Sequence, residues 1–211
     1  MIKFKLFFLA FSVLVISGCA SFSQKEIPVV TEMPKVAQFT TKPNVFVDLK
    51  LYRGEPLALN SIDVTSQVPT LKSMVSKVFD ENELFSAYTF DPFEKDKADY
   101  TIELHIYNHG NTGGAAISGF LSGFTLGVIP GAATDNYTLR SAVIGKNGEK
   151  LAEDSTKDSV TTWVGIWFIP AAGNTPQKAF DETVSNLIKD SLKKMIENKQ
   201  LKYASLYRKS Y

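Results

Sequence analysis

The stretch "DNYTLRSAVIGKNGEKLAED", residues 135–154, decides how the chain folds back on itself. Two strand-like runs flank the dipeptide Asn147-Gly148. This dipeptide is favoured in two-residue hairpin turns because both central positions need a positive φ. The stretch therefore predicts two neighbouring antiparallel strands. Apolar residues also predict strands over 44–53, 86–90, 98–110 and 159–170.

Two other segments place their apolar residues at the spacing of three and four that marks one helical face. In the segment 68–82 these residues are Val68, Leu71, Val75, Val78 and Phe79. After Thr175-Pro176, which have the pattern of a helix cap and first residue, they are Phe180, Val184, Leu187, Ile188, Leu192, Met195 and Ile196. We therefore expect an α+β fold: a mostly antiparallel sheet, two helices packed on one face, and a glycine-rich apolar insertion.

The N-terminus has the three-part plan of a secretory signal peptide, which we assign to residues 1–18. Lys3 and Lys5 precede the apolar run "LFFLAFSVLVI" of residues 6–16, and small residues follow. A helix needs about 20 apolar residues to span a bilayer. The run of eleven residues is too short, so it predicts a targeting segment rather than an anchor.

The sequence "ISGC", residues 16–19, resembles the lipobox of bacterial lipoproteins. The resemblance implies cleavage between Gly18 and Cys19, and fatty acylation of Cys19, for example with palmitate. Ala20, rather than Asp, implies the outer membrane, with the protein facing the periplasm. The alternative is an ordinary signal peptide with an incidental cysteine. Cys19 is the only cysteine, so the chain cannot form an internal disulfide.

The composition of the chain after the signal peptide favours one globular domain. Without Lys3 and Lys5, 21 basic residues face 22 acidic ones, which gives no electrostatic reason to expect nucleic acid as a partner. We expect a lipidated Cys19 with a flexible tether over 19–43, a domain over 44–200, and a loose tail over 201–211. The tether would reach about 25–30 Å. Alternatively, "VAQF" at 36–39 adds an edge strand.

The sequence predicts no catalytic residue, cofactor or metal site. His105 and His109 would lie about 13 Å apart on one strand, too far for one metal ion. The carboxylates between Asp91 and Asp99 lack the order of a calcium-binding loop and predict a solvated turn. We therefore expect a protein that is not an enzyme. The alternative is an envelope enzyme that acts on peptidoglycan or lipid.

The glycine-rich segment 111–134 is the feature whose environment the sequence leaves open. Glycine recurs at Gly119, Gly123, Gly127 and Gly131, and no Asp, Glu, Lys or Arg occurs from 104 to 134. In one helix these glycines would form a smooth stripe for close packing, and Gly123→Leu would then disrupt it. Packing as core is the first expectation; a partner surface, a membrane-dipping element and a spanning helix are the alternatives.

A second stretch resembles part of this segment. "GVIPGAA" at 127–133 and "IWFIPAAG" at 166–173 are both apolar runs closed by Ile-Pro and small residues. If the two are neighbours, they form one apolar region. The residues that we expect to contact a partner or the membrane are Phe120, Gly123, Phe124, Gly127, Trp163 and Trp167.

The order of the expected elements resembles the small periplasmic domains of TolB-type and penicillin-binding-protein-activator lipoproteins. No motif accompanies this likeness, so it implies no functional residue. From the lipobox and the lack of a catalytic motif, we expect an accessory lipoprotein of the outer membrane. Such a protein would be held to the membrane through Cys19 and would bind an envelope protein or assist envelope assembly.

Overall fold

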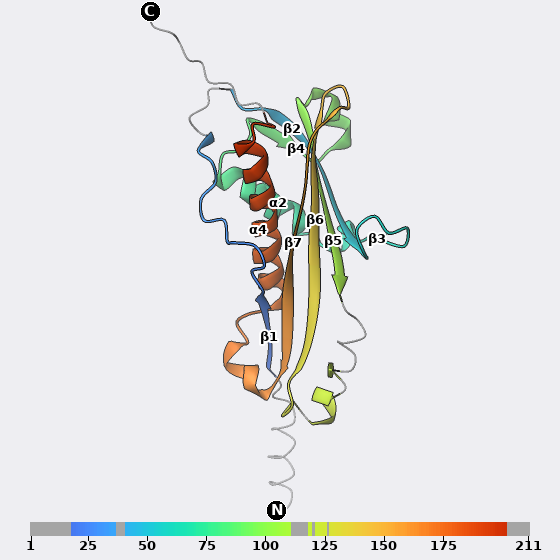
Figure 1. The fold of residues 1–211 in the computed structure, drawn as a ribbon, viewed down its shortest axis with the longest axis vertical. Helices are drawn as coiled ribbons and strands as arrows, with labels where there is room; N and C mark the ends of the chain where they lie inside the picture. Colours follow the sequence, from blue (N-terminus) through green and yellow to red (C-terminus); the bar gives the residue numbers. More distant parts are fainter. Residues whose placement is uncertain (1–17, 37–40, 111–117, 120, 126, 202–211) are drawn as a thin grey trace, which may run out of the picture. The chain divides into compact units, whose positions relative to one another are not determined.

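The computed structural model describes residues 18–36, 41–110, 118–119, 121–125 and 127–201 (Figure 1). These residues form a seven-stranded sheet in the order β1-β7-β6-β5-β2-β3, with β4 paired to β2. The sheet is mixed and mostly antiparallel, and the expected α+β fold is confirmed. Of the predicted signal peptide, residues 1–17 lie outside the described residues.

The predicted hairpin is formed by the two long strands β6 (Gly131–Gly145) and β7 (Lys150–Gly165). Its turn is a three-residue loop, 146–148, rather than the two-residue turn that Asn147-Gly148 favours. Gly148 has a φ of 84° whereas Asn147 has no positive φ, and the Gly148 N–H donates to the Gly145 carbonyl at 2.9 Å. The strand predicted over 159–170 is the continuation of β7 rather than a separate strand. It ends at Gly165, and the 3-10 turn η4 (Ile166–Ala171) follows, so the prediction is wrong for the last residues.

The centre of the sheet contains a parallel pair. Strand β2 (Asn44–Arg53) runs parallel to β5 (Tyr100–Gly110), with Leu49 opposite Leu104. Because parallel strands need a crossover, the chain between them is long, and it contains helix α2 (Leu71–Glu81). It also contains β3 (Ile62–Asp63), η2 (Thr65–Gln67), β4 (Ala87–Thr89) and η3 (Pro92–Lys97).

The chain divides into two compact units. The first unit contains the described residues within 18–24, 110–136 and 159–183. The second unit contains the described residues within 25–109, 137–158 and 184–201. Strands β6 and β7 and helix α4 (Pro176–Glu197) each contribute residues to both units.

The second unit holds a hydrophobic core between the sheet and the helices. Alternate residues of β5, among them Ile102 and Leu104, are fully buried, as the predicted alternation requires. Helix α2 buries the face that includes Val75 and Phe79. Helix α4 packs against β6, as the hydrogen bond between the buried hydroxyls of Ser191 and Ser141 shows. Figure 1 draws α2 and α4 on the same side of the sheet.

The N-terminal segment is not the flexible tether that its composition predicts. Residues Gly18–Ser23 form strand β1, which pairs antiparallel with β7, so that Cys19 lies opposite Val164. Ala20 is fully buried, and the backbone N–H of Ser21 donates to the Asn174 carbonyl at 2.7 Å. The free edge of β7 supplies the pairing that the composition of this segment does not reveal.

Residues 25–36 are also held in place, within the second unit. The backbone N–H of Glu26 donates to Asp158 at 3.1 Å, and that of Val30 donates to the Asn186 side chain at 2.8 Å. Val36, the first residue of the possible edge strand, is buried in a 3-10 turn, whereas 37–40 lie outside the described residues. The predicted tail lies outside them from residue 202 onward.

Candidate functional site

Cys19 lies on the edge strand of the sheet, in the first unit. Strand β1 ends the strand order, and the Cys19 side chain is exposed. Its partner across the strand pair, Val164, is exposed as well. Directly opposed residues of paired strands project from the same face. The thiol and the Val164 side chain therefore share one accessible face at the start of β1.

The residue before Cys19 lies against the 3-10 turn η4. A Cβ atom added to Gly18 would overlap the backbone of Phe168 and Ile169. The predicted cleavage point, between Gly18 and Cys19, therefore falls inside a paired strand that packs on η4. The position of Cys19 is thus fixed next to an apolar turn of the first unit.

The glycine-rich segment does not form one continuous helix. Residues 118–119 and 121–124 are helical, but Gly127 has a φ of 80° and Gly131 begins β6. The expectation that the four glycines share one helical face is therefore wrong. A Cβ atom at Gly119 or Gly123 would meet nothing within 4 Å, so these glycines do not permit a close approach. Phe120 lies outside the described residues.

The segments 121–129 and 166–171 instead expose large hydrophobic side chains. We call the set of six side chains that are 41% to 81% exposed the apolar surface: Leu121, Phe124, Val128, Ile129, Trp167 and Ile169. Packing as core is contradicted for Phe124, which is 81% exposed, and for Trp167, which is 67% exposed. Trp163 is half-buried and stacks on Phe168, with ring centroids 5.6 Å apart.

Hydrogen bonds join the two halves of the apolar surface. The indole Nε1 of Trp167 donates to the Val128 carbonyl at 2.9 Å, and the backbone N–H of Ile166 donates to the Gly127 carbonyl at 3.1 Å. The two similar stretches noted in the sequence are therefore neighbours, which is the condition under which they form one apolar region. Leu121, Val128, Ile129 and Ile169 were not among the predicted contact residues, because an apolar residue alone does not reveal whether it is buried.

Polar groups within the segment 121–129 bond to one another. The hydroxyl of Thr125 donates to the Leu121 carbonyl at 2.9 Å and accepts from the backbone N–H of Ile129 at 3.1 Å. The backbone N–H of Gly127 donates to the Ser122 carbonyl at 2.7 Å. These three polar groups of the exposed segment therefore have hydrogen-bond partners within the segment itself. In the described part of the chain, no helix is long and apolar enough to cross a bilayer.

The two histidines of the second unit make separate contacts on β5. His105 Nε2 lies 3.1 Å from Asp48 Oδ2, and this hydrogen bond lowers the pKa of Asp48 below its usual value of 3.8. His109 Nδ1 lies 3.3 Å from Glu55, and its Nε2 lies 2.8 Å from the Thr138 hydroxyl. Each histidine ring therefore contacts its own set of side chains, and these contacts link neighbouring parts of the fold.

The carboxylates between Asp91 and Asp99 also act separately. Asp91 caps η3 by accepting from the backbone N–H of Phe93, and Glu94 pairs with Lys97 at 2.7 Å. Asp99 accepts from the backbone N–H of Asn44 at 2.8 Å. Among the described residues, no group of three or more His, Cys, Asp or Glu side chains could hold a metal ion.

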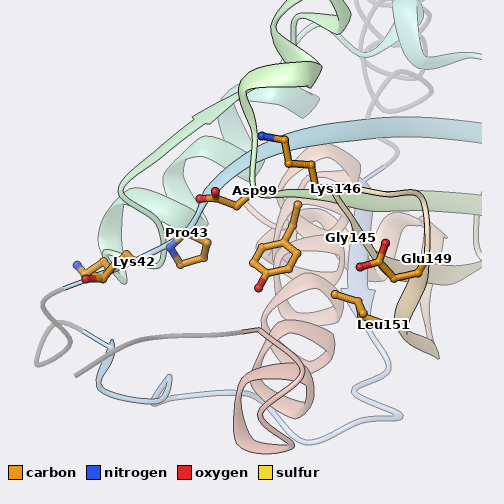
Figure 2. A pocket seen from close by; sticks show the side chains of 9 residues that line it. Lys42, Pro43, Asp99, Gly145, Lys146, Glu149 and Leu151 are labelled. Carbon is orange, nitrogen blue, oxygen red and sulfur yellow. The ribbon is translucent and has the colours of Figure 1, made fainter. Parts of the chain in front are cut away.

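A pocket of about 430 Å³ lies in the second unit, beside the turn between β6 and β7. Figure 2 shows Asp99 and Lys146 at one side of it, and Glu149 and Leu151 at the other. Asp99 already holds the start of β2, as described above. The pocket therefore combines a few charged side chains of the turn with a carboxylate that has a structural role, and it does not include the predicted contact residues.

Comparison with known proteins gives a likeness of low similarity. No family model and no curated protein matches the chain. The chain is similar to a PelC dodecamer from Paraburkholderia phytofirmans at 9% identity and a TM-score of 0.35, covering 82% of this chain and 96% of that one. A PelC variant from the same organism gives 10% identity, a TM-score of 0.36 and the same coverage. At these values, the interpretation of the site depends on its geometry.

Proposed function

We propose that the chain is a lipoprotein of the outer membrane, facing the periplasm, and that it has an accessory role: it binds an envelope protein or assists envelope assembly. The observation that carries the proposal is the position of Cys19. This residue is exposed on the edge strand β1, beside the turn η4, and it follows the sequence of a lipobox. An acyl chain on its sulfur would therefore leave the domain without displacing any part of the core.

The contacts of the polar side chains support an accessory role. His105, Asp91 and Asp99, which are the residue types that often serve in catalysis, are engaged in holding strands and turns. Two or more acyl chains provide durable attachment to a membrane. A domain held in this way can present the exposed parts of its second unit, such as Leu59 and Phe93, to another envelope protein.

The anchor is tested by Cys19→Ser in the full chain, expressed in a Gram-negative host. We expect a fatty acid label in the original chain and none in the variant, because the hydroxyl of serine is a poor substitute for the thiol. The variant should also leave the outer-membrane fraction. Ser23→Ala, at the other end of β1, is the control and should keep the label. An unlabelled original chain would contradict the anchor.

The accessory role is tested by photo-crosslinking in cells. A crosslinking residue at Leu59 or at Phe93 should capture one defined envelope protein, and a position in the buried core, such as Leu104, should capture none. Failure of every exposed position of the second unit to capture a protein would contradict the binding of a partner through that unit.

A further inference from the structure

We propose that the apolar surface inserts into the same lipid leaflet that holds the acyl chains of Cys19. The first unit then has a second, non-covalent membrane contact in addition to the covalent one. This inference rests on the lipid anchor proposed above. It assigns a specific chemistry to the apolar surface, namely the boundary between lipid headgroups and acyl chains.

Strand pairing holds Cys19 close to the apolar surface. Cys19 is paired with Val164, and neighbouring strands lie about 4.7–4.9 Å apart. Only Gly165 separates Val164 from the turn η4, which carries Trp167 and Ile169. Trp167 in turn is bonded to Val128 of the other segment. An acyl chain on Cys19 therefore brings the leaflet to the part of the first unit that exposes these side chains.

The two segments that form the apolar surface lie in stretches of the sequence without charged residues. No Asp, Glu, Lys or Arg occurs from 104 to 134 or from 159 to 177. Charged side chains are costly inside a membrane, whereas the rim of an ordinary protein interface is polar and open to solvent. Tryptophan is enriched where lipid meets water, because its ring is apolar and carries one polar group. The exposed Trp167 fits this boundary.

Several polar groups of the apolar surface form hydrogen bonds with one another. Lipid offers no partner to an N–H or a carbonyl, so every polar group that enters it must be satisfied by the protein. In the segment 121–129, the Thr125 hydroxyl, the Gly127 N–H and the Ile129 N–H all have partners within the segment. The indole N–H of Trp167 is satisfied by the Val128 carbonyl. These groups therefore meet a requirement for contact with lipid, because lipid, unlike a protein partner, cannot supply a hydrogen bond.

Exposed hydrophobic residues of the second unit, in contrast, have charged neighbours in the sequence. Phe93 is 92% exposed, but it precedes Glu94 and Lys95. Leu57 is exposed two residues after Glu55. Insertion of either side chain would draw a charge toward the membrane. Phe93 therefore serves as a matched control for Phe124, because both are highly exposed phenylalanines.

The test measures whether Trp167 lies in lipid. The full, processed and acylated chain with Trp163→Phe has Trp167 as its only tryptophan. This protein is reconstituted in vesicles of phosphatidylethanolamine and phosphatidylglycerol, with or without bromine atoms on the acyl chains. We expect its emission to shift to shorter wavelength and to lose most of its intensity in the brominated vesicles. Acrylamide, a quencher dissolved in the water, should have little effect.

Flotation of the vesicles separates the two proposals. A protein that does not float contradicts the anchor, and the inference fails with it. A protein that floats, with Trp167 quenched by acrylamide and not by bromine, overturns the inference and leaves the anchor standing. Emission that neither quencher reduces would mean that a protein surface, such as a second copy of the chain, covers Trp167. That result also overturns the inference.

A pair of variants in the Trp163→Phe background gives an independent check. Phe124→Asp should weaken the quenching of Trp167 by brominated lipid, whereas Phe93→Asp should leave it unchanged. Both side chains are highly exposed, so neither change should alter the unfolding midpoint, which is measured as the folding control. Equal quenching in the two variants would overturn the proposed contact.

Discussion

Except for a few exposed side chains of the second unit, such as Phe93, the two units of the molecule place their large apolar side chains differently. The second unit buries them between a sheet and helices, with Leu104 and Leu187 fully enclosed. The first unit leaves Phe124 and Trp167 exposed, although the segments that carry them contain no Asp, Glu, Lys or Arg. An apolar composition therefore does not by itself decide whether a side chain is buried in the core or exposed at the surface.

Charged side chains show the same contrast. In the second unit they form pairs on the surface, such as Arg140 with Glu153 at 2.7 Å and Lys50 with Asp63 at 3.1 Å. Exposed pairs of this kind contribute little to stability, because water and salt screen the attraction. Their main effect is to keep the surface of the second unit in water. The segments of the apolar surface lack such residues.

The largest expected effect separates core from surface. Leu104→Ala removes a fully buried side chain of β5 and should lower the free energy of unfolding by about 2–5 kcal/mol. Phe124→Ala, at an exposed position, should change it by no more than about 0.5 kcal/mol. Urea unfolding of the full chain in detergent micelles measures both. A loss at Phe124 as large as at Leu104 would show that the apolar surface is core.

An intermediate effect is expected at the glycines of the first unit. Gly127 has a φ of 80°, and a Cβ atom there would lie 3.3 Å from Gly165, so Gly127→Ala should destabilise the protein by about 1–2 kcal/mol. Gly123 is helical and open, so Gly123→Ala should be neutral or stabilise by up to about 1 kcal/mol. Thermal unfolding compares the two.

The open space at Gly123 also changes an expectation from the sequence. Close packing of a glycine stripe makes Gly123→Leu disruptive, but the structure leaves open space at this position. We therefore expect Gly123→Leu to leave the unfolding midpoint nearly unchanged. A large decrease would restore the packing interpretation.

The smallest expected effect is a pH dependence in the second unit. The hydrogen bond from His105 holds the pKa of Asp48 below 3.8, so the contribution of this pair to stability is present above pH 3.8 and is lost as the pH falls through the lower, folded value. Asp48→Asn should remove this part of the acid sensitivity. Midpoints of urea unfolding, measured at neutral pH and below pH 3.8, give the comparison. An unchanged difference between these midpoints would contradict the role of the pair.

The sequence predicts those parts of the fold that depend on local signals. The turn at Asn147-Gly148 and helix α4 after Thr175-Pro176 are of this kind, because cap and turn residues act on their immediate neighbours. The parallel pairing of β2 with β5 could not be predicted, because alternation marks a strand but not the direction of its partner. Strand β1 was missed for a related reason, since it exists only where β7 offers an edge.

The site shows the same division. Cys19 can be proposed as a lipidation site from the sequence alone, because the stretch that resembles a lipobox is contiguous. The exposure of the Phe124 side chain, which is 81%, could not be predicted, because it depends on the arrangement of segments that are distant in the sequence. The break at Gly127 ended the helix that a regular glycine spacing predicts, and only the structure reveals its positive φ.

The pairing of β1 with β7 has a consequence for the order of maturation, given the proposed processing at Cys19. A peptidase binds its substrate as an extended, accessible chain, and the bond before Cys19 lies inside a paired strand in the folded domain. Cleavage must therefore precede the docking of β1. Until then the edge of β7 is an unpaired template that invites association with other strands. Processing at Cys19 and closure of the sheet are thus linked, and a precursor that still carries its signal peptide keeps this edge open to other strands.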